Sequence, residues 1–133
     1  MIFQTIRKKQ PLIHCITNYV VANFQANGLL AIGASPVMAD DPQEAEEMVS
    51  IASALLVNIG TLTTRTKESM LLAGKKANAL GVPVILDPVA AGATAYRKQT
   101  VLQLLDTIHF AVIRCNVGEL AAIANVQWQQ KGV

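Results

Sequence analysis

The stretch Val82-Pro83-Val84-Ile85-Leu86-Asp87 decides the fold class of this chain. It is an apolar run that stops abruptly at a carboxylate, just before a segment of helical character. Continuous apolar runs of this length are typical of parallel strands whose faces are covered by helices. Four further runs end in the same way, at residues 11–16 before Thr17-Asn18, 36–39 before Asp40, 54–57 before Asn58-Ile59-Gly60, and 110–113 before Arg114.

The sequence therefore predicts an α/β fold of alternating β-α units around a mainly parallel sheet. Two architectures fit this alternation: an open, doubly wound sheet, and part of a (β/α)₈ barrel. Ligands of open α/β sheets bind outside the carboxyl ends of the strands. The residues that end or follow the runs are thus the candidates for function, and we expect them along one edge: Asn18, Met38, Asn58, Asp87, Arg114 and Asn116.

The helix after Thr17-Asn18 could be capped by either residue, and Gly33 is suited to end it in a left-handed conformation. Glycine within a helix costs about 1 kcal/mol relative to alanine, so Gly28 suggests a close backbone approach. One face of this helix carries the residues at helical spacing: Val20, Phe24, Gly28 and Ala31.

The second helix has the clearest start signal, with Asp41 as N-cap, Pro42 at the first helical position and Glu44 two residues further on. The third is predicted to begin near Thr63 or Thr64 and to stop at Gly81, with the buried positions Met70, Ala73, Ala77 and Leu80. The fourth carries Val101, Leu104, Leu105 and Ile108. The fifth starts at Asn116 and carries Leu120 and Ile123.

Length and composition indicate one domain or part of one: 133 residues, 52% hydrophobic and 15% charged. This apolar content predicts that some surface is buried by oligomerisation or by further chain. The net charge of +2 is too small to indicate nucleic-acid binding. Cys15 and Cys115 have no zinc or disulfide-framework spacing and fit a reducing, cytoplasmic setting. We expect no signal peptide and no membrane span.

Asp87 is followed by a loop of small residues, 88–94, whose N–H groups could approach an anion. A carboxylate in this position could hold Mg²⁺ directly or through water beside a phosphate. Alternatively, Asp87 begins an Asp-Pro turn and accepts local N–H bonds. The chain contains no Walker P-loop spacing.

Arg114 could bind a phosphate as a two-pronged donor. Asn116 and Glu119 are one helical turn apart, so Glu119 could lie near a hydrated Mg²⁺ ion. The same spacing is that of an N-cap with a reaching acid, and both interpretations can hold together. Asn18 could bind a heterocycle or cap a helix, and Met38 could pack against a ring or belong to the core.

His14 is adjacent to Cys15 on a strand, so their side chains point to opposite faces and form no dyad. We interpret His14 as a structural histidine. His109 is expected in the loop before the fifth strand and receives no role.

Taken together, five segments resemble hydroxyethylthiazole kinase, a thiamin-salvage enzyme family of the ribokinase-like superfamily. They are residues 11–21 (PLIHCITNYVV), 26–39 (ANGLLAIGASPVMA), 57–62 (VNIGTL), 82–89 (VPVILDPV) and 112–116 (VIRCN). The resemblance runs from about Pro11 to Val133. It implies that residues 1–133 are the N-terminal part of a single ribokinase-like α/β domain.

The resemblance implies transfer of the γ-phosphoryl group of ATP, with Mg²⁺, to the alcohol of 4-methyl-5-(2-hydroxyethyl)thiazole. It implies thiazole contacts from Met38 and Asn18, and nucleotide contacts from Arg114 and Asn116. Asp87 and Glu119 would lie around the metal and its waters. Family members are typically trimers with the substrate pocket between subunits, which implies a homo-oligomer.

The chain departs from the family in two places. The loop after Asp87 usually reads Gly-Ala-Gly, whereas Ala90 stands first here, and its methyl group could crowd the turn. The family usually has Arg-Gly-Asn, whereas Cys115 replaces the glycine and would be strained if that position needs a positive φ.

The family's glycine-rich anion hole, much of its adenine pocket and the residue facing the alcohol belong to a second half. We therefore expect no catalytic residue within these 133 residues and little kinase activity from them alone. Cys115 belongs to a different strand end and is not that residue. The alternatives are a non-catalytic remnant that folds, oligomerises or binds thiazole, a hydroxymethylpyrimidine kinase of the same superfamily, and an unrelated barrel fragment.

Overall fold

Five parallel strands form one sheet in the order β2-β1-β3-β4-β5, in a computed structural model that describes residues 1–127. Each predicted run overlaps one of these strands, and the α/β prediction is confirmed. Their bounds are β1 Leu12–Ile16, β2 Ser35–Val37, β3 Ala54–Asn58, β4 Val84–Asp87 and β5 Val112–Ile113. A barrel would need consecutive strands to be neighbours. In the part of the chain that the structure describes, β1 separates β2 from β3, so the sheet is open and the barrel alternative is wrong.

The strand ends lie in register across the sheet. Ile16 pairs with Val57, Val57 with Leu86, and Leu86 with Ile113. One step further, Asn58 pairs with Asp87. Because all five strands are parallel, their carboxyl ends share one edge. We call this the carboxyl edge.

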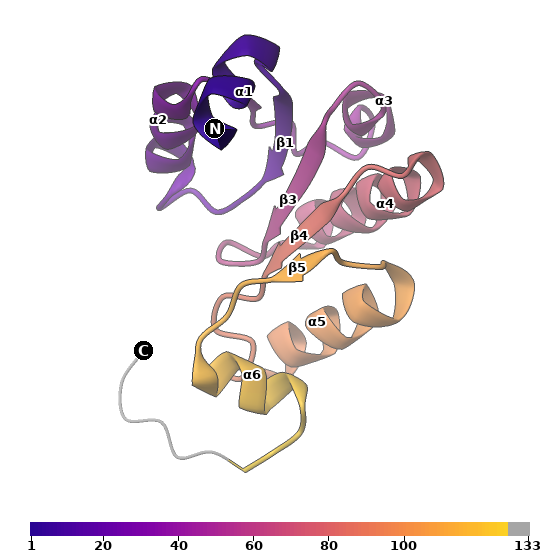
Figure 1. Cartoon of the computed structure of the whole chain (residues 1–133). Coiled ribbons are helices and arrows are strands. Elements are labelled where there is room, and N and C mark those ends of the chain that lie inside the picture. Colours follow the sequence, from indigo (N-terminus) through magenta and orange to yellow (C-terminus); the bar gives the residue numbers. More distant parts are fainter. Residues whose placement is uncertain (128–133) are drawn as a thin grey trace.

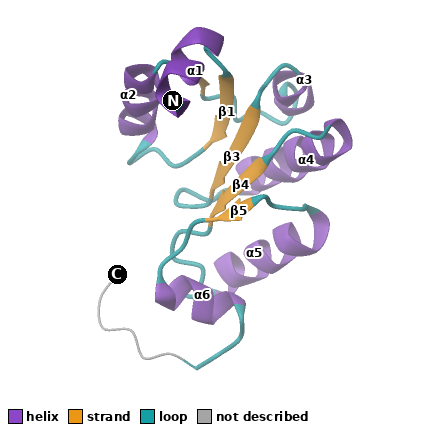
Figure 2. Ribbon diagram, viewed as in Figure 1, coloured by secondary structure: helices purple, strands orange, loops and turns teal. Residues whose placement is uncertain are grey.

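Helices flank the sheet on both sides, as predicted (Figure 1). In that view α1 and α2 lie on one side, beside β1, and α3, α4 and α5 lie on the other. Figure 2 shows the same layers with the strands between them. The helices are α1 Ile2–Lys9, α2 Ala22–Ile32, α3 Ala45–Ser50, α4 Thr64–Leu80, α5 Ala95–Thr107 and α6 Val117–Ile123.

The main core lies on the side of α3, α4 and α5. Side chains of β3 and β4 alternate between fully buried and half-buried positions, because only this side is completely covered. Burying one such aliphatic side chain contributes about 1.5–3 kcal/mol. The buried strand residues of the cluster are Ile16, Leu55, Val57, Val84 and Leu86, and the helices add Val49, Met70, Ala73, Ala77, Val101 and Leu104.

Two helix starts differ from prediction. α2 begins only at Ala22, and neither Thr17 nor Asn18 is its N-cap, because Asn18 Oδ1 accepts from Val21 N over 3.1 Å and closes a turn before the helix. α3 begins only at Ala45, because Asp41 Oδ1 accepts from Gln43 N and closes a turn before the helix. In both places the residue types are suited to capping, but the side-chain oxygens accept hydrogen bonds in turns that precede the helices.

The apolar face predicted for α2 points away from the core. Val20 just before α2 and Phe24 within it are 89% and 80% exposed, and α2 buries no residue completely. The predicted close approach at Gly28 is wrong, since a Cβ there would meet nothing within 4 Å. Such an approach occurs instead at Gly74 of α4, where a Cβ would clash with the side chain of Ile108.

α4 and α6 begin where the sequence predicts. Thr63 caps α4 in a reciprocal capping box with Thr66, and Gly81 ends it with φ +71°. Leu80 is the exception to the predicted burial, at 51% exposed, because it lies in the last turn. Gly33 ends α2 with φ +95°, as predicted. α1 was not predicted; it ends with Arg7-Lys8-Lys9, which suits the negative end of a helix dipole.

Candidate functional site

A row of hydrogen-bonded side chains crosses the carboxyl edge from β1 to β5. Asn18 Nδ2 donates to Asn58 Oδ1 over 2.8 Å, and Asn58 Nδ2 donates to Asp87 Oδ2 over 3.0 Å. Arg114 Nη1 lies 3.5 Å from the same Asp87 oxygen. The residues come from loops or strand ends after β1, β3, β4 and β5. We call these four residues the edge network, and it brings Asn18, Asp87 and Arg114 together as the sequence predicts.

Asn58 is the centre of the edge network. Its Oδ1 accepts from Asn18 Nδ2 and also from Gly60 N, over 2.9 Å. Its Nδ2 donates to Asp87, so both ends of the amide are used and its orientation is fixed. Asn58 is buried, and an unpaired amide there would cost about 1–3 kcal/mol. The sequence predicts that Asn58 lies at this edge but does not indicate a role for it.

Asp87 has one oxygen in the edge network and one free of it. Oδ1 is buried and has no hydrogen-bond partner among the described residues. Burial raises the pKa of the Asp87 carboxyl above its ordinary value, and the nearby Arg114 guanidinium opposes that rise. An unpartnered carboxylate oxygen at this edge is suited to a cation.

Arg114 is held only loosely. Its side chain is 77% exposed, and its single contact with Asp87, at 3.5 Å, is long for a charge-assisted hydrogen bond. An exposed pair of this kind contributes about 0–1 kcal/mol. The guanidinium is therefore free to turn toward an anion without a large loss of stability.

Asn116 and Glu119 form the capping box of α6. Asn116 Oδ1 accepts from Glu119 N over 2.8 Å, and Glu119 Oε2 accepts from Asn116 N over 2.9 Å. Glu119 Oε1 accepts from Ala90 N over 3.0 Å, which ties the loop after β4 to the start of α6. Its negative charge also acts on Asp87 and raises the pKa of that carboxyl. The capping interpretation of this pair is confirmed, and Glu119 also lies close enough to act on Asp87.

The two departures from the family pattern have different outcomes. Ala90 has φ +54°, a left-handed conformation in which a Cβ is strained. Cys115 is not among the residues with positive φ, so it causes no strain of this kind. The Cβ of Ala90 therefore strains the backbone, whereas the replacement of glycine by Cys115 does not.

Met38 lies just after β2 and is half-buried. It does not line the hollow described below. Its loop is fixed by the following residues: the carbonyl of Ala39 accepts from His14 Nε2 over 2.6 Å, and the carbonyl of Asp40 accepts from Ser69 Oγ over 2.8 Å. His14 is fully buried on β1, consistent with the structural role predicted for it.

A hollow of about 510 Å³ opens directly beside the edge network. All four network residues line it, together with apolar side chains of the β1–α2 segment. Gln25 of α2 also lines it, and its buried Oε1 has no partner within the described residues. The site thus offers amides, a carboxylate and a guanidinium next to an apolar wall formed by Val20, Val21 and Phe24.

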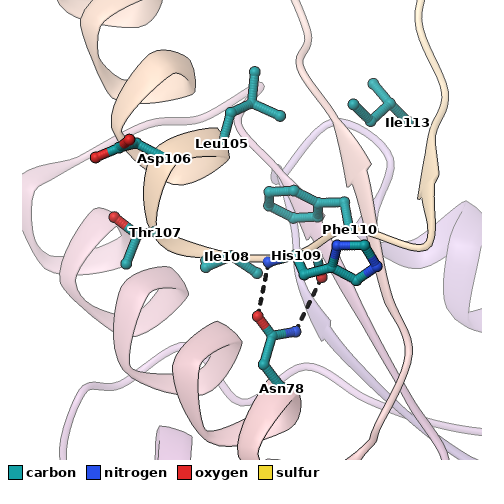
Figure 3. Close-up of a pocket in the computed structure, with 8 residues that line it drawn as sticks. All are labelled: Asn78, Leu105, Asp106, Thr107, Ile108, His109, Phe110 and Ile113. Atoms are coloured by element: carbon teal, nitrogen blue, oxygen red, sulfur yellow. Dashed lines mark hydrogen bonds between the residues drawn. The ribbon is translucent and has the colours of Figure 1, made fainter.

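A second hollow, of about 480 Å³, lies at the opposite edge of the sheet (Figure 3). There Asn78 Oδ1 accepts from His109 N and Asn78 Nδ2 donates to the His109 carbonyl, at 2.7 and 2.9 Å. These bonds fix the loop between α5 and β5, where His109 was expected. None of the predicted site residues lines this hollow.

This edge could hold a divalent cation only if phosphate oxygens and water supplied most of its ligands. Among residues 1–127 no three His, Cys, Asp or Glu side chains gather in a metal-binding cluster. Mg²⁺, however, is commonly held by one or two carboxylates together with phosphate oxygens and water. The unpartnered Asp87 Oδ1 fits that donor set, with Glu119 near enough to influence its charge.

Arg97 is a residue near the site that the sequence analysis missed. Its guanidinium donates to carbonyls of the loops after β3 and β4. No local pattern identifies such a residue, because its acceptors are main-chain atoms about 8–38 positions away. Within the described part of the chain, no helix has the length and apolarity to cross a membrane.

Comparisons with known proteins agree on one family. The model of the "Hydroxyethylthiazole kinase family" matches residues 3–133. A hydroxyethylthiazole kinase of Lysinibacillus sphaericus (strain C3-41) is 80% identical over 100% of this chain and 52% of the relative. One from Haemophilus influenzae (strain PittEE) is 59% identical over 96% of this chain and 49% of the relative.

The fold has a close counterpart among solved structures. The structure of a hydroxyethylthiazole kinase protein from Pyrococcus horikoshii OT3 superposes with a TM-score of 0.88 at 46% identity, covering 92% of this chain and 48% of that one. The chain thus spans about half the length of the curated relatives that it matches.

Proposed function

The chain belongs to the hydroxyethylthiazole kinase family, and from that premise we propose that its carboxyl edge serves ATP-dependent phosphorylation of a thiazole alcohol. The substrate would be 4-methyl-5-(2-hydroxyethyl)thiazole, in thiamin salvage. Residues 1–133 would form the N-terminal part of one ribokinase-like domain.

One observation supports this proposal above the others: the edge network places the exposed guanidinium of Arg114 beside Asp87, a carboxylate with one unpartnered oxygen. Phosphoryl transfer needs positioning and neutralisation of phosphate charge more than covalent chemistry from the protein. Asp87 lines the hollow with its Oδ1 buried and unpartnered, and the exposed Arg114 lies 3.5 Å from the other carboxylate oxygen, Oδ2. A cation and a phosphate would both find partners there.

We assign the two ends of the edge to different parts of the reaction. Asn18 and Met38, after β1 and β2, would contact the thiazole ring. Arg114 and Asn116, after β5, would contact the nucleotide. Asp87 and Glu119 would hold Mg²⁺ and its waters, and the ion would neutralise charge on the phosphate oxygens. Glu119 reaches the metal only through water in this arrangement, because both of its oxygens already accept from backbone N–H groups.

In the reaction the alcohol oxygen forms a bond to the γ-phosphorus of ATP, and the bond to the β,γ-bridging oxygen breaks, releasing ADP. The alcohol proton leaves to solvent or to a base outside the residues assigned here. Arg114 would stabilise the negative charge on the transferred group, since a guanidinium binds phosphate oxygens in pairs.

We propose a homo-oligomer, a trimer by family resemblance, in a reducing, cytoplasmic setting. The strongly exposed Val20 and Phe24 lie at the wall of the hollow. A neighbouring subunit covering them would bury apolar surface and close the hollow at the same time. Sedimentation of the purified chain tests this point.

Calorimetry tests the proposed site directly. We expect the thiazole alcohol and MgADP each to bind saturably to the 133-residue chain. Asp87→Asn and Arg114→Ala should weaken MgADP binding about tenfold or more, since each removes a charge that acts on metal or phosphate. Lys75→Gln, a change of the same size in charge at an exposed position of α4, is the matched control. Equal affinity in Asp87→Asn and the unmodified chain would contradict the proposal.

We further propose that these 133 residues bind substrates without efficient turnover. The chain spans about half the length of its relatives, and the resemblance places the anion hole outside the matched segments. A phosphorylation assay with ATP, Mg²⁺ and the thiazole alcohol measures this against the full-length Lysinibacillus relative. Turnover comparable to that relative would overturn the expectation.

A further inference from the structure

One guanidinium joins the two loops that follow the central strands of the site. Arg97 Nη1 donates to the carbonyls of Ile59 and Val89 over 2.8 and 3.0 Å, and Nη2 donates to the carbonyl of Gly60 over 2.8 Å. Ile59 and Gly60 follow Asn58 directly, and Val89 lies two residues after Asp87. Arg97 itself stands in the first turn of α5, where Thr94 Oγ1 accepts from its backbone N.

Among the described residues, all hydrogen bonds of the Arg97 guanidinium go to these three carbonyls. No carboxylate among residues 1–127 forms an ion pair with Arg97. Three bonds from a planar donor to main-chain acceptors fix both its plane and the carbonyls that it contacts. A lysine could not reproduce this pattern, because its charge sits on a single nitrogen.

Gly60 transmits this restraint to the edge network. Its carbonyl accepts from Arg97, and its N–H donates to Asn58 Oδ1. Asn58 in turn donates to Asp87 Oδ2, which leaves Oδ1 as the free oxygen. The space at this point is tight, since a Cβ on Gly60 would lie 2.6 Å from Asn18 Nδ2. A small shift of the loop would therefore disturb both asparagines.

We propose that Arg97 is a positioning residue, which locks the loops after β3 and β4 together and so sets the direction in which Asp87 presents its free oxygen. The inference rests on the proposed function only for the identity of the ligand at Asp87. The restraint itself is a property of this chain and is measurable without any ligand.

The unmodified chain provides the first test. With ¹⁵N-labelled arginine, the two Nη groups of Arg97 should give separate, slowly exchanging NMR signals, because carbonyls accept from three of their four protons. The exposed Arg114 should give one averaged signal. An averaged signal for Arg97 as well would overturn the proposal, and this result needs no variant to fold.

Variants provide the second test. Arg97→Met keeps the apolar stem and removes every donor, and Arg97→Lys keeps the charge without the planar fork. Both should shift the Asn58 side-chain amide signals and raise the exchange rate of the Gly60 amide about tenfold. Thr94→Ala is the matched control: it removes the N-cap bond to the backbone N of Arg97 and keeps every donor of the Arg97 guanidinium. If Thr94→Ala changes these signals as much as the Arg97 variants do, the effect belongs to α5 in general and the proposal is wrong.

Mn²⁺, used alone as a probe for a divalent cation, separates this inference from the proposed function. The concentration that half-broadens the Asn58 amide signals should rise about tenfold in both Arg97 variants, as for other residues that support a metal ligand, and by less than about twofold in Thr94→Ala. If Mn²⁺ broadens nothing in the unmodified chain, the metal assignment of Asp87 fails. The Nη and Gly60 measurements then still decide the role of Arg97.

Discussion

Arg114 Nη1 lies 3.5 Å from Asp87 Oδ2, although 27 positions separate the two residues in the sequence. They meet because β4 and β5 are parallel neighbours and both residues stand at the carboxyl ends. The same geometry brings Asn58 to the other side of Asp87. The Asp87 carboxylate thus shares Oδ2 between a neutral amide and an exposed cation, and its buried Oδ1 is left without a partner among the described residues.

Asn58→Ala should be the most destabilising change at the edge. It leaves Asn18 Nδ2 and Gly60 N without their acceptor and removes a donor from Asp87. Unpaired buried groups of this kind cost about 1–3 kcal/mol each, so we expect a loss of about 2–4 kcal/mol in urea unfolding. Asn23→Ala is the control, because the Asn23–Asn27 bond on α2 is exposed and should contribute less than about 0.5 kcal/mol. Similar losses of stability in the two variants would show that the buried hydrogen bonds of Asn58 contribute no more than an exposed amide bond does.

Alanine should have opposite effects at two glycines. A Cβ at Gly60 would lie 2.8 Å from Asn18 Cβ, so Gly60→Ala should cost about 1–3 kcal/mol and displace Asn18. A Cβ at Gly28 meets nothing within 4 Å and lies inside α2, so Gly28→Ala should stabilise the chain by about 0.5–1 kcal/mol. Thermal unfolding of both variants measures the difference in sign. Destabilisation by Gly28→Ala would mean that its face of α2 is covered in solution.

Ala90→Gly should stabilise the chain, because φ +54° is unfavourable for any residue with a Cβ. We expect a gain of about 0.5–1 kcal/mol, reduced by the greater entropy of glycine in the unfolded state. Cys115→Gly is the comparison, since that backbone needs no positive φ and glycine should cost about 0.5–1 kcal/mol there. Equal effects at the two positions would contradict the assignment of strain to Ala90 alone.

Asp87→Asn should raise the stability at neutral pH while weakening metal binding. Burial raises the pKa of Asp87, so the folded state holds its proton more tightly than the unfolded state does. Stability contributed by this group therefore falls as the pH rises through its folded pKa, and a neutral side chain avoids that loss. We expect a gain on the order of 1 kcal/mol at pH 7.5, typical of relieving a strained functional group. The gain should vanish near pH 3, where Asp87 is already protonated, and a gain independent of pH would contradict this explanation.

The two thiols should differ sharply in reactivity. Cys15 is buried within β1, and burial raises its pKa to about 11, so it remains protonated at pH 8. Cys115 is only half-buried, at the rim of the site. A colorimetric thiol titration of the native chain should therefore find one fast-reacting cysteine. Cys115→Ser should abolish the fast phase, and its survival in that variant would show that β1 opens readily.

Much of the fold can be predicted because short sequence patterns, each spanning only a few residues, mark the ends of helices and strands. The capping boxes of α4 and α6 are formed by residues three apart, so Thr63 and Asn116 were recognisable as helix starts. The strand ends were visible because a polar residue interrupts each buried run. These features depend on the chain itself more than on its tertiary surroundings.

Contacts between distant segments explain what the sequence did not reveal. Asn18 has the chemistry of an N-cap, but its Nδ2 donates to Asn58, 40 positions away, and its Oδ1 accepts from Val21 N in a turn, so α2 starts later. α1 has no capping side chain, and it packs where Gly33 leaves room for Arg7. In the sequence Arg97 looks like any other helical arginine, because the carbonyls to which it donates belong to loops that only the folded structure brings near it.

Within the edge network, the strand order separates neutral side chains from charged ones. Because β1 and β3 are neighbours, Asn18 and Asn58 meet there, and Asp87 and Arg114 follow in the direction of β5. A ligand lying along this edge would be read by neutral dipoles at one end and by full charges at the other. In the proposed function, contacts to the ring and contacts to the anion would thus be spatially separate, and one set could be redesigned while the other is left intact.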